Sequence, residues 1–142
     1  MRLVDVNVLV YAFREDSPGH ARYREWLREL LESDEAYAVS DQVLSGFLRI
    51  VTHPKIFRPP APLDMALRFA AAIRQRPNAV QVTPGPRHWE IFTRLCREAS
   101  AKGNLIADAW LAALAIESGS EFITTDRDYA RFSGLRWSHP LA

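Results

Sequence analysis

Three aspartates lie in stretches of sequence that are otherwise mostly apolar. Asp5 interrupts the apolar, β-branched run at residues 3–12, which is typical of a buried strand leading into a short helical turn. Asp108 lies within the alanine-rich stretch 104–118, and Asp126 follows Ile123-Thr124-Thr125 at the end of a predicted strand. Because an ionised carboxylate is costly to bury unless it is paired or binds a cation, each of these acids is a candidate functional residue.

If the three acids converge, their chemistry is restricted. Carboxylates about 4 Å apart repel one another by about 4 kcal/mol per pair at an effective dielectric of about 20. Such a cluster must take up protons or bind a cation. Oxygen ligands alone favour Mg²⁺ or Mn²⁺ over zinc. Because a carboxylate-held Mg²⁺ activates water and stabilises charge on a phosphate, the cluster predicts phosphodiester hydrolysis.

Each acid also has a structural role open to it. Asp5 could accept backbone hydrogen bonds at the end of a strand, and Asp108 could lie on a solvated stripe of its helix. Asp126 could cap a short helix that begins near Arg127. Asn104 precedes Asp108 by one helical turn, where it could add a polar ligand or a hydrogen bond.

The elements that must position these acids alternate between helices and short strands. A helix is predicted from Pro18, with Ser17 as its N-cap, and another after Ser40. Further helices are predicted at 63–74, 86–100 and 104–118, and further strands at 37–39, 79–82, 121–125 and 136–137. The alternation predicts a parallel α/β sheet in a single domain over residues 1–142, at whose carboxyl edge Asp5 and Asp126 could meet.

Composition excludes several other classes of protein. The chain has 142 residues and a net charge of only +1, so its overall charge does not indicate nucleic-acid binding. Its single cysteine excludes a disulfide framework. The sequence shows no apolar run long enough for a bilayer and no signal peptide, and we therefore expect a cytoplasmic protein without membrane contact.

Three segments together resemble the successive motifs of a PIN domain, namely Val4–Leu9, Asp108–Ala113 and Thr124–Tyr129. The chain is also similar to the VapC toxins of VapBC toxin–antitoxin pairs, and further segments resemble one subgroup of them: Leu44–Pro54, Pro84–Trp89 and Gly103–Ile106. The resemblance covers essentially the whole chain, and the order and spacing of the motifs carry it.

The resemblance implies a PIN-like three-layer fold and a Mg²⁺-dependent endoribonuclease that cleaves structured RNA, often tRNA or rRNA. Carried over by position, Asp5 and Asp108 would be metal ligands, Asp126 would complete the site through water, and Thr124 would support them by a hydrogen bond. It further implies a homodimer that is silenced by a cognate VapB-like antitoxin.

We expect that antitoxin against two amphipathic helices, around Tyr23–Leu31 and Val43–Val51. Both carry large apolar side chains, including Trp26 and Phe47. The alternative is that these side chains belong to the core, which is the better interpretation for most of them.

The sequence departs from the family pattern at one position. Many PIN domains carry a glutamate three residues before an arginine, and in the register marked by Arg49 this chain has Gly46. The nearest acid is Asp41, which could replace the missing glutamate or could simply face the dipole of its helix. The number of metal ions, one or two, therefore stays open.

Two other functions remain possible. A PIN-like module could bind RNA or a partner without cutting, and the absence of an acid at position 46 keeps that alternative open. A haloacid-dehalogenase-like phosphatase would also place an aspartate after its first strand. It would require a second aspartate two residues later, where this chain has Asn7.

Overall fold

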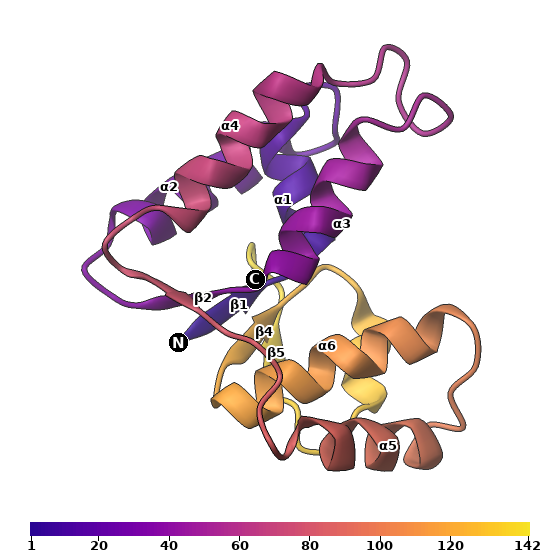
Figure 1. Ribbon diagram of the computed structural model, residues 1–142. Helices are drawn as coiled ribbons and strands as arrows, with labels where there is room; N and C mark the ends of the chain where they lie inside the picture. Colours follow the sequence, from indigo (N-terminus) through magenta and orange to yellow (C-terminus); the bar gives the residue numbers. More distant parts are fainter.

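The computed structural model describes residues 1–142, and its strands form one parallel sheet between two layers of helices (Figure 1). The five strands follow the order β3-β2-β1-β4-β5, and every pair is parallel. They are β1 (Arg2–Val4), β2 (Tyr37–Val39), β3 (Ala79–Gln81), β4 (Glu121–Ile123) and β5 (Trp137–Ser138). The predicted parallel α/β architecture with three layers is confirmed.

The helices divide between the two faces of the sheet (Figure 1). One layer contains α1 (Val6–Phe13), α2 (His20–Glu32), α3 (Asp41–Val51) and α4 (Leu63–Arg74). The other contains α5 (His88–Glu98) and α6 (Asn104–Ser118), and a short 3₁₀ helix at Arg127–Arg131 follows β4. No helix combines the length and the apolar composition that crossing a bilayer requires.

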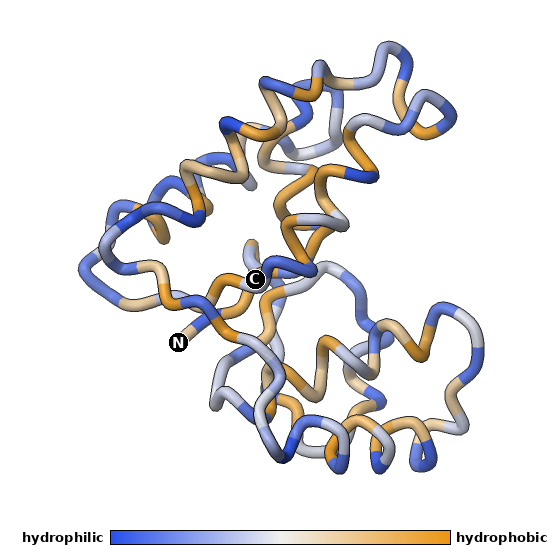
Figure 2. Tube along the Cα trace, viewed as in Figure 1, coloured by the Kyte–Doolittle hydropathy of each residue, from blue (hydrophilic) through white to orange (hydrophobic).

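Two hydrophobic cores result from the alternation of side chains along the strands. In β1, Val4 packs into the core of the α1–α4 layer, whereas Leu3 packs into the core of the α5–α6 layer. In β2, Tyr37 and Val39 face the first layer and Ala38 faces the second. In Figure 2, α1 carries hydrophobic segments, whereas α2 carries many hydrophilic ones.

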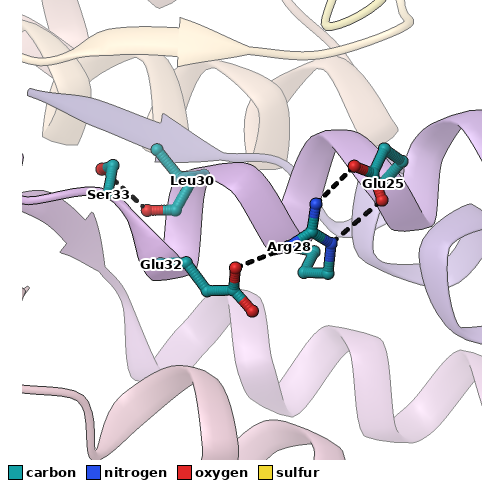
Figure 3. Close-up of polar contacts among 5 residues, drawn as sticks. All are labelled: Glu25, Arg28, Leu30, Glu32 and Ser33. Carbon is teal, nitrogen blue, oxygen red and sulfur yellow. Dashed lines mark hydrogen bonds and ion pairs between the residues drawn. The ribbon is translucent and has the colours of Figure 1, made fainter.

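The start of α2 differs from the prediction. Neither Ser17 nor Pro18 begins the helix, because Gly19 is its N-cap and has a φ of 75°. A positive φ is incompatible with a continuous right-handed helix, so the chain turns at Gly19 before the helix begins. On the exposed side of α2, Arg28 pairs with Glu25 and Glu32 (Figure 3).

The element next to Asp5 is also more helical than predicted. Only residues 2–4 form a strand, and the following residues form the eight-residue helix α1 rather than a short turn. The N-cap of α1 is Asp5, whose side chain accepts a hydrogen bond from the backbone N–H of Val6. Because such a cap stabilises the first turn, the acid that interrupts the apolar run is also the residue that ends the strand.

Candidate active site

The register of the sheet brings Asp5 and Thr124 to the same edge. Val4 pairs with Ile123, and the Asp5 N–H donates to the Ile123 carbonyl oxygen at 2.9 Å. Asp5 and Thr124 therefore follow neighbouring parallel strands, at the carboxyl edge where ligands bind in such sheets. Their side chains meet there, and the Thr124 hydroxyl donates to Asp5 Oδ2 at 2.7 Å.

Asp5 is a buried carboxylate, with only 6% of its surface exposed. Its Oδ1 accepts the Val6 backbone N–H at 2.7 Å. Burial raises the pKa of Asp5 to about 6, against the opposing effect of its bonds to Thr124 and Val6, while the charges of Asp108 and Asp126 raise the pKa further. Burial is thus the main cause of the shift, and repulsion by the charges of the other two predicted acids adds to it.

Asp126 has the structural role that its sequence position allowed, and it is also linked to Asp5 through Thr124. Its Oδ1 accepts the Asp128 backbone N–H at 2.9 Å, so it caps the 3₁₀ helix as the structural interpretation requires. Its own backbone N–H donates to the Thr124 hydroxyl oxygen at 3.0 Å. Thr124 is thus bonded to both acids, and Asp126 adds negative charge beside Asp5 and Asp108.

Asp108 approaches from α6, in the layer opposite α1. It is half-buried, and its Oδ1 accepts the Tyr129 hydroxyl at 3.1 Å. Burial raises the pKa of Asp108, the Tyr129 bond lowers it, and the charges of Asp126 and Asp128 raise it. Sequence reasoning missed Tyr129, because its contact with Asp108 depends on how the short 3₁₀ helix packs against α6.

One buried oxygen beside the acids has no partner. Asn7 Nδ2 lies 3.4 Å from the Thr124 hydroxyl oxygen, and Asn7 Oδ1 is buried without a hydrogen bond. The Thr124 hydroxyl donates its only proton to Asp5. If the Asn7 amide group were flipped, its Oδ1 would therefore face an oxygen atom that has no proton to donate to it. Buried acceptors are normally satisfied, so this atom marks a place where a water or cation could bind.

The donor set fits a hydrated divalent cation better than a closely caged one. No group of three or more His, Cys, Asp or Glu side chains is spaced to ligate a single ion directly. The site instead offers the carboxylates of Asp5 and Asp108, whose pKa values are both raised, together with the unpartnered amide oxygen of Asn7. Mg²⁺ commonly keeps several waters and binds to one or two carboxylates, which such an arrangement allows.

The remaining predicted site residues lie apart from these contacts. Asn104 is exposed at the start of α6 and has no hydrogen bond to any of the acids. Asp41 is exposed in the first turn of α3, and its Oδ1 lies 2.8 Å from Arg74 Nε. The bond to Arg74 lowers the pKa of Asp41. Its geometry therefore favours the interpretation of Asp41 as a helix-end charge.

Gly46 lies where α3 packs against α1. A Cβ atom at this position would be 3.2 Å from Val6 Cγ2, which is a tight contact. Val6 directly follows Asp5, so position 46 faces the part of α1 closest to the candidate site. The glycine permits close approach of the two helices where many PIN domains carry an acid.

Comparison with known proteins identifies relatives over nearly the whole chain. The family model described as PIN domain matches residues 2–135. Ribonuclease VapC43 of Mycobacterium tuberculosis is 45% identical over 141 residues, which cover 99% of this chain and 96% of that protein.

Solved structures show the same fold. The VapBC2 structure from Rickettsia felis, bound to a promoter DNA fragment, matches with a TM-score of 0.70 at 17% identity and covers 97% of both chains. Mycobacterium tuberculosis VapC20, described as a sarcin–ricin loop cleaving toxin, matches with a TM-score of 0.65 at 18% identity. That match covers 96% of this chain and 99% of the other.

Proposed function

The chain belongs to the PIN domain family and, within it, to the VapC ribonucleases, and we propose that Asp5, Asp108 and Asp126 carry its endoribonuclease activity. As a VapC ribonuclease it is the divalent-metal-dependent toxin of a toxin–antitoxin pair. The observation that supports these three residues is that they act on one another's charge at the carboxyl edge of the sheet: the charges of Asp108 and Asp126 raise the pKa of Asp5, and the charge of Asp126 raises the pKa of Asp108. The matched family covers the chain over most of its length, and we treat residues 1–142 as one domain.

The ion we propose is Mg²⁺, with Mn²⁺ able to replace it. Asp5 and Asp108 would hold it directly, and Asp126 would act through a water molecule. When bound, the ion lowers the pKa of water and neutralises charge on the phosphate. Thr124 fixes the orientation of the Asp5 carboxylate, and the free Asn7 Oδ1 can accept a hydrogen bond from a water in the site.

The residues then position the reactants for hydrolysis. A water oxygen forms a bond to phosphorus while the bond from phosphorus to a ribose oxygen breaks, and the departing oxygen is protonated. Asp5 and Asp108 approach from opposite helical layers, so a phosphate between them would meet the positive charge of the ion that both carboxylates hold. Without the ion, the two negative carboxylates would repel the phosphate.

Cleavage of a structured RNA, either tRNA or an rRNA fragment, tests the proposal. We expect cleavage with Mg²⁺ or Mn²⁺, none in excess chelator, and losses of at least about 100-fold in Asp5→Asn and Asp108→Asn. Asp128→Asn is the matched control, because Asp128 is exposed and is paired with Arg131 at 3.5 Å. Undiminished cleavage in chelator would contradict the metal-dependent site. A protein that binds RNA without cutting it under any metal condition would instead match the non-cleaving module.

The substrate we propose is a folded RNA, because VapC20, which shares this fold, is described as cleaving the sarcin–ricin loop. The phosphatase interpretation is not favoured, since the family match identifies ribonucleases. RNA and a toxin that acts on it would share the cytoplasm, which is where we place the protein.

The regulatory partner we propose is a VapB-like antitoxin, since related folds were solved as VapBC complexes. The helices predicted to receive it keep most of their large side chains in the core: Phe47 and Leu27 are buried, whereas Trp26 and Leu31 are partly exposed. We therefore restrict the expected contact on α2 to the partly exposed residues.

Co-expression with the neighbouring small gene should give a stable complex and suppress toxicity, and failure to co-purify would count against this partner. Light scattering on the purified protein should give the mass of a homodimer.

A further inference from the structure

Tyr129 places a phenol group against the candidate site while its ring is held in the core. The residue is 2% exposed. Its ring centroid lies 4.6 Å from that of Phe122 and 5.7 Å from that of Phe132. Both neighbours are buried apolar side chains, so the ring has little freedom to move. The hydroxyl is the polar end of an otherwise apolar anchor, and it donates to Asp108 Oδ1 at 3.1 Å.

The same short segment of chain also orients Asp5. Thr124 and Tyr129 lie on either side of Asp126, and each donates its hydroxyl to a different acid. Thr124 bonds to Asp5 Oδ2, and Tyr129 bonds to Asp108 Oδ1. The other oxygen of Asp108 receives no hydrogen bond from the protein. A carboxylate held through one oxygen has the other oriented and available.

Packing alone does not account for the hydroxyl. Phenylalanine would fill the space between Phe122 and Phe132 equally well and would require no hydrogen-bond partner. A buried hydroxyl costs free energy unless it is bonded, and its partner here is a half-buried carboxylate. Asp108 lies on α6, where without this bond its side chain could rotate toward solvent.

We propose that Tyr129 is a positioning residue, whose hydroxyl fixes the Asp108 carboxylate so that its opposite oxygen is presented to the divalent cation. This inference rests on the function proposed above, because it assigns Asp108 as a ligand. Residues that hydrogen-bond metal ligands typically change metal affinity or activity by about 10- to 100-fold when they are replaced. A carboxylate fixed in advance loses less conformational freedom when the ion binds.

The test compares Tyr129→Phe with Tyr37→Phe. Tyr37 is an equally buried tyrosine, and its hydroxyl donates to the Ile73 carbonyl oxygen in the other core. Each substitution removes one oxygen and one buried hydrogen bond. Mn²⁺ affinity is measured by isothermal titration calorimetry without RNA, and the metal concentration for half-maximal RNA cleavage is measured separately.

We expect Tyr129→Phe to weaken Mn²⁺ binding about 10-fold and to raise the half-maximal metal concentration by a similar factor. At saturating metal its cleavage rate should approach that of the parent. Tyr37→Phe should lose thermal stability without any change in Mn²⁺ affinity. In an Asp108→Asn background, Tyr129→Phe should have no further effect on metal binding.

Unchanged Mn²⁺ affinity in Tyr129→Phe would overturn the inference while leaving the proposed function intact, provided that Asp108→Asn binds Mn²⁺ weakly. If Asp108→Asn binds as tightly as the parent, the proposed site itself is wrong. Should Tyr129→Phe fail to fold, ultraviolet difference absorption on the parent decides the question. Mg²⁺ should then perturb the tyrosine band in the parent and not in Asp108→Asn, and a flat parent spectrum overturns the inference.

Discussion

At the scale of single residues, the buried carboxylate of Asp5 makes the metal-free protein sensitive to pH. Burial raises its pKa from 3.8 to about 6. Because the folded state binds the proton more tightly than the unfolded chain, the contribution of Asp5 to stability is full below about pH 4. This contribution to the free energy of unfolding, on the order of 3 kcal/mol, is lost as the pH rises through about 6.

Asp5→Asn should remove that dependence. We expect the unfolding free energy of the variant, measured in urea without metal, to exceed that of the parent by a margin that grows between pH 4 and pH 7. Comparing the two proteins at each pH cancels the titration of all other groups. A margin that is constant with pH would mean that Asp5 is ionised at no cost in the fold.

Thr124 allows the hydroxyl and the shape of one side chain to be separated. Thr124→Val keeps the volume of this fully buried residue but removes the donor to Asp5 and the acceptor of the Asp126 N–H. We expect a loss of about 2 kcal/mol in stability and a marked drop in RNA cleavage. Thr124→Ser keeps the hydroxyl and loses a methyl group, so it should cost about 1 kcal/mol and retain most activity. Equal activity in the two variants would remove Thr124 from the site.

At the scale of elements, the contact between Asp41 and Arg74 joins the start of α3 to the end of α4. Both side chains are exposed, and exposed ion pairs contribute about 1 kcal/mol or less. Asp41→Asn should therefore lower stability only slightly and leave RNA cleavage within about twofold of the parent. If cleavage instead collapses with stability unchanged, Asp41 replaces the acid that is missing at position 46.

The elements also show which features a sequence can predict. The limits of α4 and α6 were predicted to the residue, because apolar periodicity and a terminal glycine such as Gly119 act locally. The N-cap at Ser40 is confirmed, whereas the start of α2 depended on the positive φ of Gly19 and was wrong. The position of Asp5 at the carboxyl edge, beside the strand that leads to Asp126, was predictable from the parallel sheet, whereas the approach of Asp108 depends on the packing of α6. The bond from Tyr129 to Asp108 was not predictable either, because it depends on how the 3₁₀ helix packs.

At the scale of the whole molecule, the metal should couple to folding. A ligand that binds only the folded state at 100 times its dissociation constant adds about 2.7 kcal/mol of stability. For a chain of 142 residues this corresponds to a rise in Tm of roughly 10 °C. We expect Mg²⁺ to produce such a rise in the parent and a much smaller one in Asp108→Asn, measured by calorimetry. Equal rises in both proteins would place the ion elsewhere.

The pairing of β1 with β4 has a consequence for the order in which the protein is made. Asp5 leaves the ribosome early, but its hydrogen-bond partner Thr124 is separated from it by 119 positions along the chain. Asp126 and Tyr129 follow Thr124, so the proposed site is incomplete in a nascent chain until residues 124–129 have emerged. With the site proposed above, we expect the nascent ribonuclease to be inactive while those residues are still to be made. The cell therefore has the whole of that interval in which to supply the protein that silences it.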